Sequence, residues 1–123
     1  MSTELVIEVK EIESGKTMPL YVFGCVRDKI DLPIDDNEHD LTKDVISEQL
    51  VNFSAKIKEL KAQQELLKYA NEGAEALWEI WSECENEITH YEFLLKMFSV
   101  FLDIESDNKY LIPANKLVYY WSY

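Results

Sequence analysis

Four glutamates recur at every fourth position in the second half of the chain: Glu75, Glu79, Glu83 and Glu87. On a helix this spacing places their carboxylates in one row, where like charges repel by a few tenths of a kcal/mol per pair unless cations relieve them. Glu72 extends the acidic segment, and no lysine or arginine occurs between Lys68 and Lys96. The chemistry open to such a row is the binding of basic groups.

Two interpretations of the row remain open. In the first, Lys61 lies near Glu83 and Lys68 near Glu75 or Glu79, so that the row is a solvated, partly neutralised face. In the second, the row binds a basic partner, and Trp78 beside it serves as an apolar interface anchor, unless that ring packs under a turn. The predicted contact residues are Glu72, Glu75, Trp78, Glu79, Glu83 and Glu87.

A second acidic cluster lies in "DLPIDDNEHD", where the candidate binding residues are Asp35, Asp36, Glu38 and Asp40. Asn37 and His39 add further possible metal ligands, but the cluster lacks the ligand spacing and the distant glutamate of a calcium loop. The pattern favours a solvated loop over a metal site. Asp40 or Thr42 is expected to cap the helix that follows.

The remaining reactive residues do not form a catalytic pattern. His39 and His90 have no nucleophile or carboxylate at the spacing of a triad or an acid and base pair. Cys25 and Cys84 are predicted to be inert, buried thiols. Arg27 is the only arginine, which disfavours a phosphate pocket. We therefore expect no cofactor, no metal and no enzymatic activity.

Long helices must position the acidic row. Residues that are apolar except for Gln64 recur at alternating steps of four and three before Gly73, at Ile46, Leu50, Phe53, Ile57, Leu60, Gln64 and Leu67. The same spacing returns after Gly73, at Leu77, Trp81, Cys84, Ile88, Tyr91, Leu95, Phe98 and Leu102. Each set forms one seam of the coiled-coil type.

The chain either reverses at Asn71 to Gly73 or continues as one helix. A seven-residue repeat from Ile46 to Leu102 runs unbroken through the glycine, and one glycine inside a helix costs only about 1 kcal/mol. However, the companion seam fails at Gln64 and returns shifted by one position, while Asn and Gly readily end a helix. The hairpin is favoured.

Strands are expected at both ends of the sequence. In "TELVIEVKEI" apolar residues alternate with Glu4, Glu8 and Lys10, which predicts a strand with one wet face. A turn at "ESGK" leads into "PLYVFGCV", which reads as a strand buried on both faces. An irregular loop follows over residues 27–40, and "NKLVYYWSY" predicts a third strand, for which a position inside the sheet is favoured over one at an edge.

These elements predict an α+β protein of order β-β-α-α-β. Because residues 93–104 are apolar nearly all round, a long antiparallel helical hairpin should pack at its open end against a small three-stranded antiparallel sheet. At 123 residues the chain is expected to form a single domain, 1–123. The seams also make a homodimer possible.

Charge and hydropathy restrict the partners. The formal net charge of −12 disfavours direct contact with nucleic acid or anionic lipid and favours a basic protein partner. The N-terminus lacks a signal peptide pattern, and the most apolar helical piece is too short to span a membrane, so the chain is expected in the cytoplasm.

Three functions follow from these observations. The first is a non-catalytic acidic protein-binding module, an inhibitor that occupies a basic, nucleic-acid-binding groove as phage-encoded nucleic-acid mimics do. The second is an assembly subunit whose seams and aromatic C-terminal strand drive oligomerisation. The third is an enzyme or small-ligand binder with a pocket between hairpin and sheet. No motif decides among the three.

Overall fold

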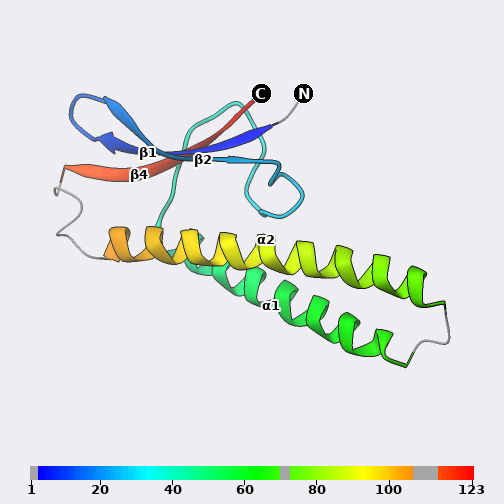
Figure 1. Cartoon of the computed structure of the whole chain (residues 1–123). Helices are drawn as coiled ribbons and strands as arrows, with labels where there is room; N and C mark the ends of the chain where they lie inside the picture. Colours follow the sequence, from blue (N-terminus) through cyan, green and yellow to red (C-terminus); the bar gives the residue numbers. More distant parts are fainter. Residues whose placement is uncertain (1–2, 70–72, 107–113) are drawn as a thin grey trace. The chain divides into compact units, whose positions relative to one another are not determined.

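A computed structural model describes residues 3–69, 73–106 and 114–123 (Figure 1). Its elements are β1 (Glu4–Glu11), β2 (Thr17–Gly24), β3 (His39–Asp40), α1 (Lys43–Leu67), α2 (Ala74–Ser106) and β4 (Asn115–Ser122). The α+β class and the helical hairpin are confirmed. The predicted sheet was one strand short, because β3 forms inside the stretch that we expected to be irregular.

The chain divides into two compact units. The sheet unit comprises residues 1–49 and 100–123, and it contains all four strands, the first turns of α1 and the end of α2. The hairpin unit comprises residues 50–99 and holds the remainder of both helices. Neither helix has, over the residues described, a stretch long and apolar enough to cross a membrane.

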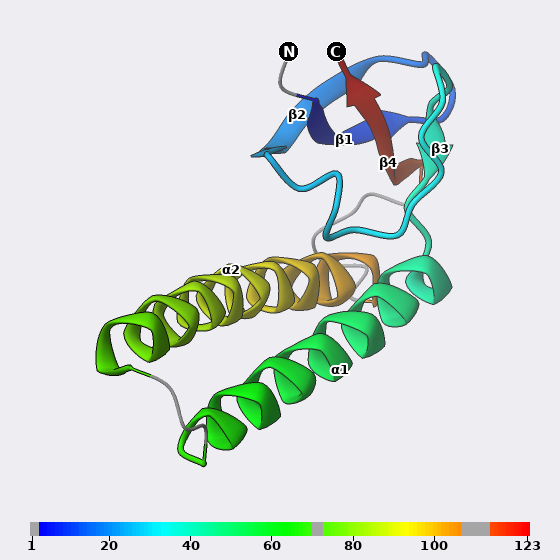
Figure 2. The same ribbon diagram turned by 90° about the vertical axis from the view of Figure 1, so that its right-hand side faces the viewer.

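The four strands form one antiparallel sheet in the order β2-β1-β4-β3 (Figure 2). The turn predicted at "ESGK" joins β1 to β2, and Gly15 adopts there a positive φ of 73°, which residues with a side chain rarely adopt. β4 pairs with β1 along its whole length and with the two residues of β3. The C-terminal strand therefore lies inside the sheet, which was the favoured prediction.

Our prediction of solvent exposure was wrong for both N-terminal strands. We expected the first to have one solvent-exposed face and the second to be buried on both faces. β1 lies between two neighbours, and residues Leu5 to Glu8 are all buried, including the Glu8 carboxylate that we placed on a wet face. β2 is an edge strand that leaves Met18, Leu20 and Val22 exposed. Sheet order decides burial here, and the hydrophobic pattern of one strand does not encode that order.

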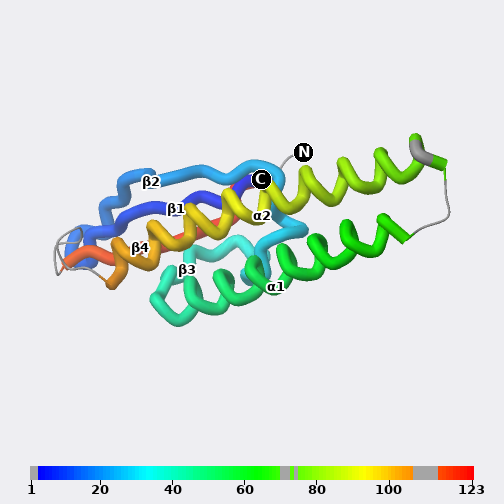
Figure 3. The backbone as a smooth tube through the Cα atoms, turned by 60° about the horizontal axis from the view of Figure 1, so that its bottom comes forward, coloured from blue at the N-terminus to red at the C-terminus, as the bar shows by residue number. Residues whose placement is uncertain are grey.

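The two helices run in opposite directions in the hairpin unit (Figure 3). Phe53 of α1 lies 6.2 Å from the ring of Tyr91 and 5.2 Å from the ring of Phe98 on α2. Further along, Gln63 of α1 approaches Cys84 of α2. These contacts confirm the antiparallel seam. α1 ends at Leu67 and α2 begins at Ala74, while Asn71 and Glu72 lie outside the described residues.

Polar groups fix the start of α1 in the sheet unit. The Thr42 hydroxyl accepts a hydrogen bond from the Val45 N–H at 3.3 Å, so Thr42 is the capping residue, while Asp40 pairs elsewhere. One turn later Gln49 is buried, and its amide exchanges two hydrogen bonds with the backbone of Asp31. This buried amide holds the loop between β2 and β3 to α1.

Candidate protein-binding surface

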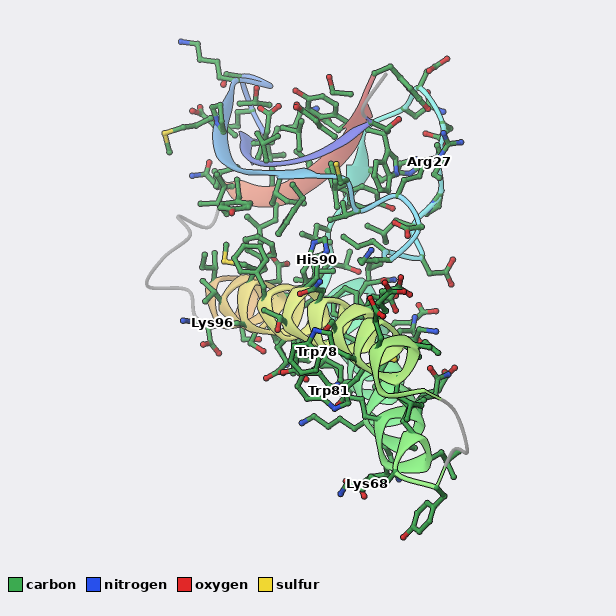
Figure 4. The ribbon with its side chains drawn as sticks, turned by 45° about the vertical axis from the view of Figure 1, so that its right-hand side comes forward. Arg27, Lys68, Trp78, Trp81, His90 and Lys96 are labelled. Carbon is green, nitrogen blue, oxygen red and sulfur yellow. The ribbon has the colours of Figure 1, made fainter. Side chains whose placement is uncertain are left out.

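An apolar groove of about 370 Å³ lies in the hairpin unit, near the end of α1 and the start of α2. We call it the tryptophan groove; it is lined by Gln64, Leu67, Lys68, Leu77, Trp78 and Trp81. The indole rings of Trp78 and Trp81 stack with centroids 5.6 Å apart and planes inclined by 15°. Figure 4 shows both rings on the same side of α2. Trp78 remains 66% exposed, so the prediction of an exposed ring is confirmed.

The groove lies where the α1 seam has a polar residue, Gln64, in place of an apolar one. Gln64 was the one polar member of the α1 seam, and its Nε2 donates to Glu85 Oε2 at 2.9 Å and to the Trp81 carbonyl at 3.4 Å. An amide that turns toward these oxygens does not cover an indole ring. Trp81, which we predicted as a seam residue, is consequently 38% exposed and stacks on Trp78. The signal for this exposure was Gln64 itself.

The acidic row, Glu75, Glu79, Glu83 and Glu87, is exposed along α2. None of these four carboxylates has an ion-pair partner among the residues that the structure describes. The interhelical ion pairs that we predicted are not formed, because Lys68, just after the end of α1, binds Glu65 of α1 at 3.1 Å, and Lys61 has no described partner. Glu72 lies outside the described residues. The row therefore remains uncompensated.

Helical geometry places the start of the row closest to Trp78. Glu75 and Glu79 flank Trp78 at three residues before it and one after it. Each further step of four residues turns about 40° beyond a full turn, since a helix has about 100° per residue. Glu83 and Glu87 therefore lie progressively farther round α2 from Trp78. A ligand in the groove would meet the first two carboxylates before the last two.

Three of the four acidic side chains of the acidic loop, residues 35–40, in contrast have partners within the sheet unit. Lys10 of β1 binds Glu38 at 2.6 Å, and Lys116 of β4 binds Asp40 at 2.9 Å. His39 Nε2 lies 2.8 Å from Asp35 Oδ1. Of the four candidate binding residues in this loop, only Asp36 has no ion-pair partner in the described part of the chain.

Several pKa shifts record these contacts. The hydrogen bond from His39, helped by that from the Asn37 N–H, lowers the pKa of Asp35. The hydrogen bond to Asp40 raises the pKa of Lys116. The Tyr120 hydroxyl donates to Glu8, which raises the pKa of Tyr120. In each case the hydrogen bond stabilises the protonation state that forms it. These polar groups therefore hold parts of the sheet unit together.

The acidic residues do not gather into a metal centre. Across residues 3–69, 73–106 and 114–123, no three His, Cys, Asp or Glu side chains are grouped so as to hold a metal ion. His39 instead stacks on Tyr119, with ring centroids 5.3 Å apart.

The two cysteines differ in their surroundings. Cys84 is buried in the hairpin seam, as predicted, and its thiol approaches Gln63 Oε1 at 3.8 Å. Cys25 is exposed, and the prediction of a buried thiol was wrong. It follows the end of β2 with a positive φ of 56°, where the backbone bends out of the sheet. A lone thiol in this position nominates no chemistry.

Comparison with known proteins adds no constraint on function. Neither family models, nor curated proteins, nor solved structures include a match to this chain. The tryptophan groove and the acidic row are therefore the features from which a function can be inferred.

Proposed function

We propose that this chain is a non-catalytic protein-binding module that holds a basic partner through the tryptophan groove and the acidic row. One observation carries the proposal: α2 presents both an exposed pair of stacked tryptophans and four exposed glutamates that have no described ion-pair partner. Tryptophans are enriched among the residues that dominate binding energy, and large exposed apolar patches mark interaction sites.

Electrostatics supports a basic partner over a neutral one. The like charges of the row repel within α2, and cations from a partner would relieve that repulsion. The same charges would accelerate association, because attraction between opposite charges steers the encounter. Additional apolar side chains in this half of the hairpin unit are exposed, among them Leu66, Tyr69 and Ile80. A partner that is both basic and apolar would satisfy both properties of the surface.

The proposed partner surface is a basic groove that otherwise binds nucleic acid. The support is the net charge of −12 together with a regular row of carboxylates, since nucleic acid also presents regularly repeated negative charge. In this role the chain would act as an inhibitor by occupying the groove. An added DNA duplex would then compete with the chain for its partner.

The test is capture of partners from a lysate by immobilised chain at low and high salt. We expect captured proteins to be basic, to be released by salt and to be displaced by DNA. Trp78→Ala, and the triple change Glu75→Gln, Glu79→Gln and Glu83→Gln, should each greatly reduce the capture. A control with Glu4→Gln, Glu11→Gln and Glu13→Gln removes three exposed charges from the sheet unit instead. Equal capture by all the variants would reject the proposal.

A second candidate, an assembly subunit, is favoured by β2. This edge strand exposes Met18, Leu20 and Val22, and no charged residue occurs from Thr17 to Val26. Edge strands without charges readily pair with another chain. The seams and the C-terminal strand that we first assigned to this role contact other parts of the same chain. Light scattering of the wild type and of Val22→Lys would test it: a dimer that the lysine dissociates supports assembly, and a wild-type monomer excludes it.

A further inference from the structure

We infer that the partner inserts a basic amphipathic α-helix into the tryptophan groove, as a third helix against α1 and α2. This inference rests on the proposed function and names the element that the module recognises. It follows from the shape of the groove, from the position of the carboxylates beside it and from the charge of the chain.

The groove lies between two antiparallel helices. Leu67 at the end of α1 and Lys68 just after it line one side, whereas Leu77, Trp78 and Trp81 line it from α2. Leu67 and Leu77 are only partly buried although both belong to the seam, so this end of the hairpin leaves apolar surface uncovered. An apolar furrow between paired helices suits a third helix, whose side chains at positions i, i+3, i+4 and i+7 enter it.

The carboxylates fix the chemistry of that helix. Glu75 and Glu79 lie one helical turn apart, about 6 Å along α2 at about 1.5 Å per residue. Lysine or arginine at positions i and i+4 of a partner helix has the same spacing, so two cations can meet two carboxylates. Trp78 is three residues after Glu75 and one before Glu79, and an exposed indole favours contact with a cation or with its aliphatic stem.

A second copy of this chain is a poor occupant. Its own α2 would bring another acidic row to the site. No lysine or arginine occurs between Lys68 and Lys96, so this part of a second copy has no cation to pair with Glu75 and Glu79. Opposed rows of glutamate would repel each other in the interface. Charge complementarity therefore selects a basic partner over self-association at this groove.

The experiment uses the full chain and two synthetic peptides of identical composition. One arranges leucine and lysine so that a helix has an apolar face flanked by lysines at i and i+4, and the other has the same residues in scrambled order. Binding is measured by calorimetry and by the fluorescence of Trp78 and Trp81. We expect the amphipathic peptide to bind at least about tenfold more tightly than the scrambled one, since nonspecific charge attraction is the same for both.

Two pairs of substitutions locate the peptide. Trp78→Ala should weaken binding by about tenfold or more, and Trp78→Phe should weaken it by less. Because the Trp78 ring is largely exposed, both variants should keep the fold, and circular dichroism would verify this. The double variant Glu75→Gln and Glu79→Gln should weaken binding several-fold more than Glu83→Gln with Glu87→Gln. The second double variant is a matched control, because it removes two charges from the same row.

Three results would overturn the inference: equal binding of the two peptides, no effect of Trp78→Ala, or equal effects of the two double variants. Failure here is distinct from failure of the proposed function. If lysate capture depends on Trp78 and the acidic row but the peptide order has no effect, the module binds a basic surface of another form. If capture is also independent of those residues, both proposals are wrong.

Discussion

The acidic loop and the acidic row look alike in the sequence but are used differently in the structure. Around the loop, Lys10, His39 and Lys116 each contact one carboxylate, and the loop is held to the sheet. Along α2, no described cation contacts the row, although lysines are present on the neighbouring helix. A cluster of acidic residues therefore indicates a binding surface only after its internal partners have been accounted for.

Stability should respond most strongly to the packing that supports the row. Ile88 is 2% exposed in the hairpin seam, one residue beyond Glu87. Ile88→Ala should lower the free energy of unfolding by about 2 to 5 kcal/mol, because it leaves a cavity. Lys58→Ala, on the exposed face of α1, should change it by less than about 0.5 kcal/mol. Urea denaturation measures both, and equal midpoints would refute the seam assignment.

The second largest expected effect on stability concerns the buried amide of Gln49, which holds the loop between β2 and β3. Gln49→Met preserves approximate volume but removes both hydrogen bonds to the Asp31 backbone, at a cost of about 1 to 3 kcal/mol. Hydrogen exchange should show increased opening across residues 27–38, while the hairpin unit keeps its protection. Uniform loss of protection in both units would contradict the local role of Gln49.

Fold prediction succeeded where a local pattern encodes the answer. The heptad spacing and the Asn71 to Gly73 segment identified two antiparallel helices. Alternating apolar residues identified β1, and runs rich in β-branched and aromatic residues identified β2 and β4. Sheet order was not predictable in this way, because the period of a strand does not specify its neighbours. β1 and β2 consequently had their exposures exchanged, and the two-residue β3 was too short to leave a pattern.

The candidate site was also predicted only in part. Trp78 and the row could be found from spacing, since both lie outside the seam of a single helix. The neutralisation of the acidic loop could not, because Lys10 and Glu38 are 28 positions apart and meet only through the sheet. The exposure of Trp81 depends on the hydrogen bond that Gln64 of α1 makes to Glu85 of α2. A contact between two helices of this kind is part of the tertiary structure and has no local pattern. The acidic loop and the acidic row have similar local sequences, and only the contacts between elements distinguish them.

Neutralising the two regions should shift stability in opposite directions. Glu75→Gln, Glu79→Gln and Glu83→Gln together relieve repulsion and should leave the free energy of unfolding unchanged or raise it by up to about 1 kcal/mol. The loop variant with Asp35→Asn, Glu38→Gln and Asp40→Asn removes the same number of charges but breaks three contacts, so it should be less stable than the wild type. Shifts of the same sign would remove the distinction between the regions.

The smallest expected effect is the pH dependence of the loop. Because the pKa of Asp35 is lowered in the fold, its stabilising contribution is present above the unfolded value of about 3.9 and is lost as the pH falls through the lower folded value. Asp35→Asn removes that contribution, so its melting temperature should fall less between pH 5 and pH 2.5 than that of the wild type. His39→Phe keeps a ring against Tyr119 but removes the donor, and it should reduce the acid sensitivity in the same direction. Parallel decreases in all three proteins would mean that the contact between His39 and Asp35 does not stabilise the loop, and the contrast with the acidic row would then rest on Lys10 and Lys116 alone.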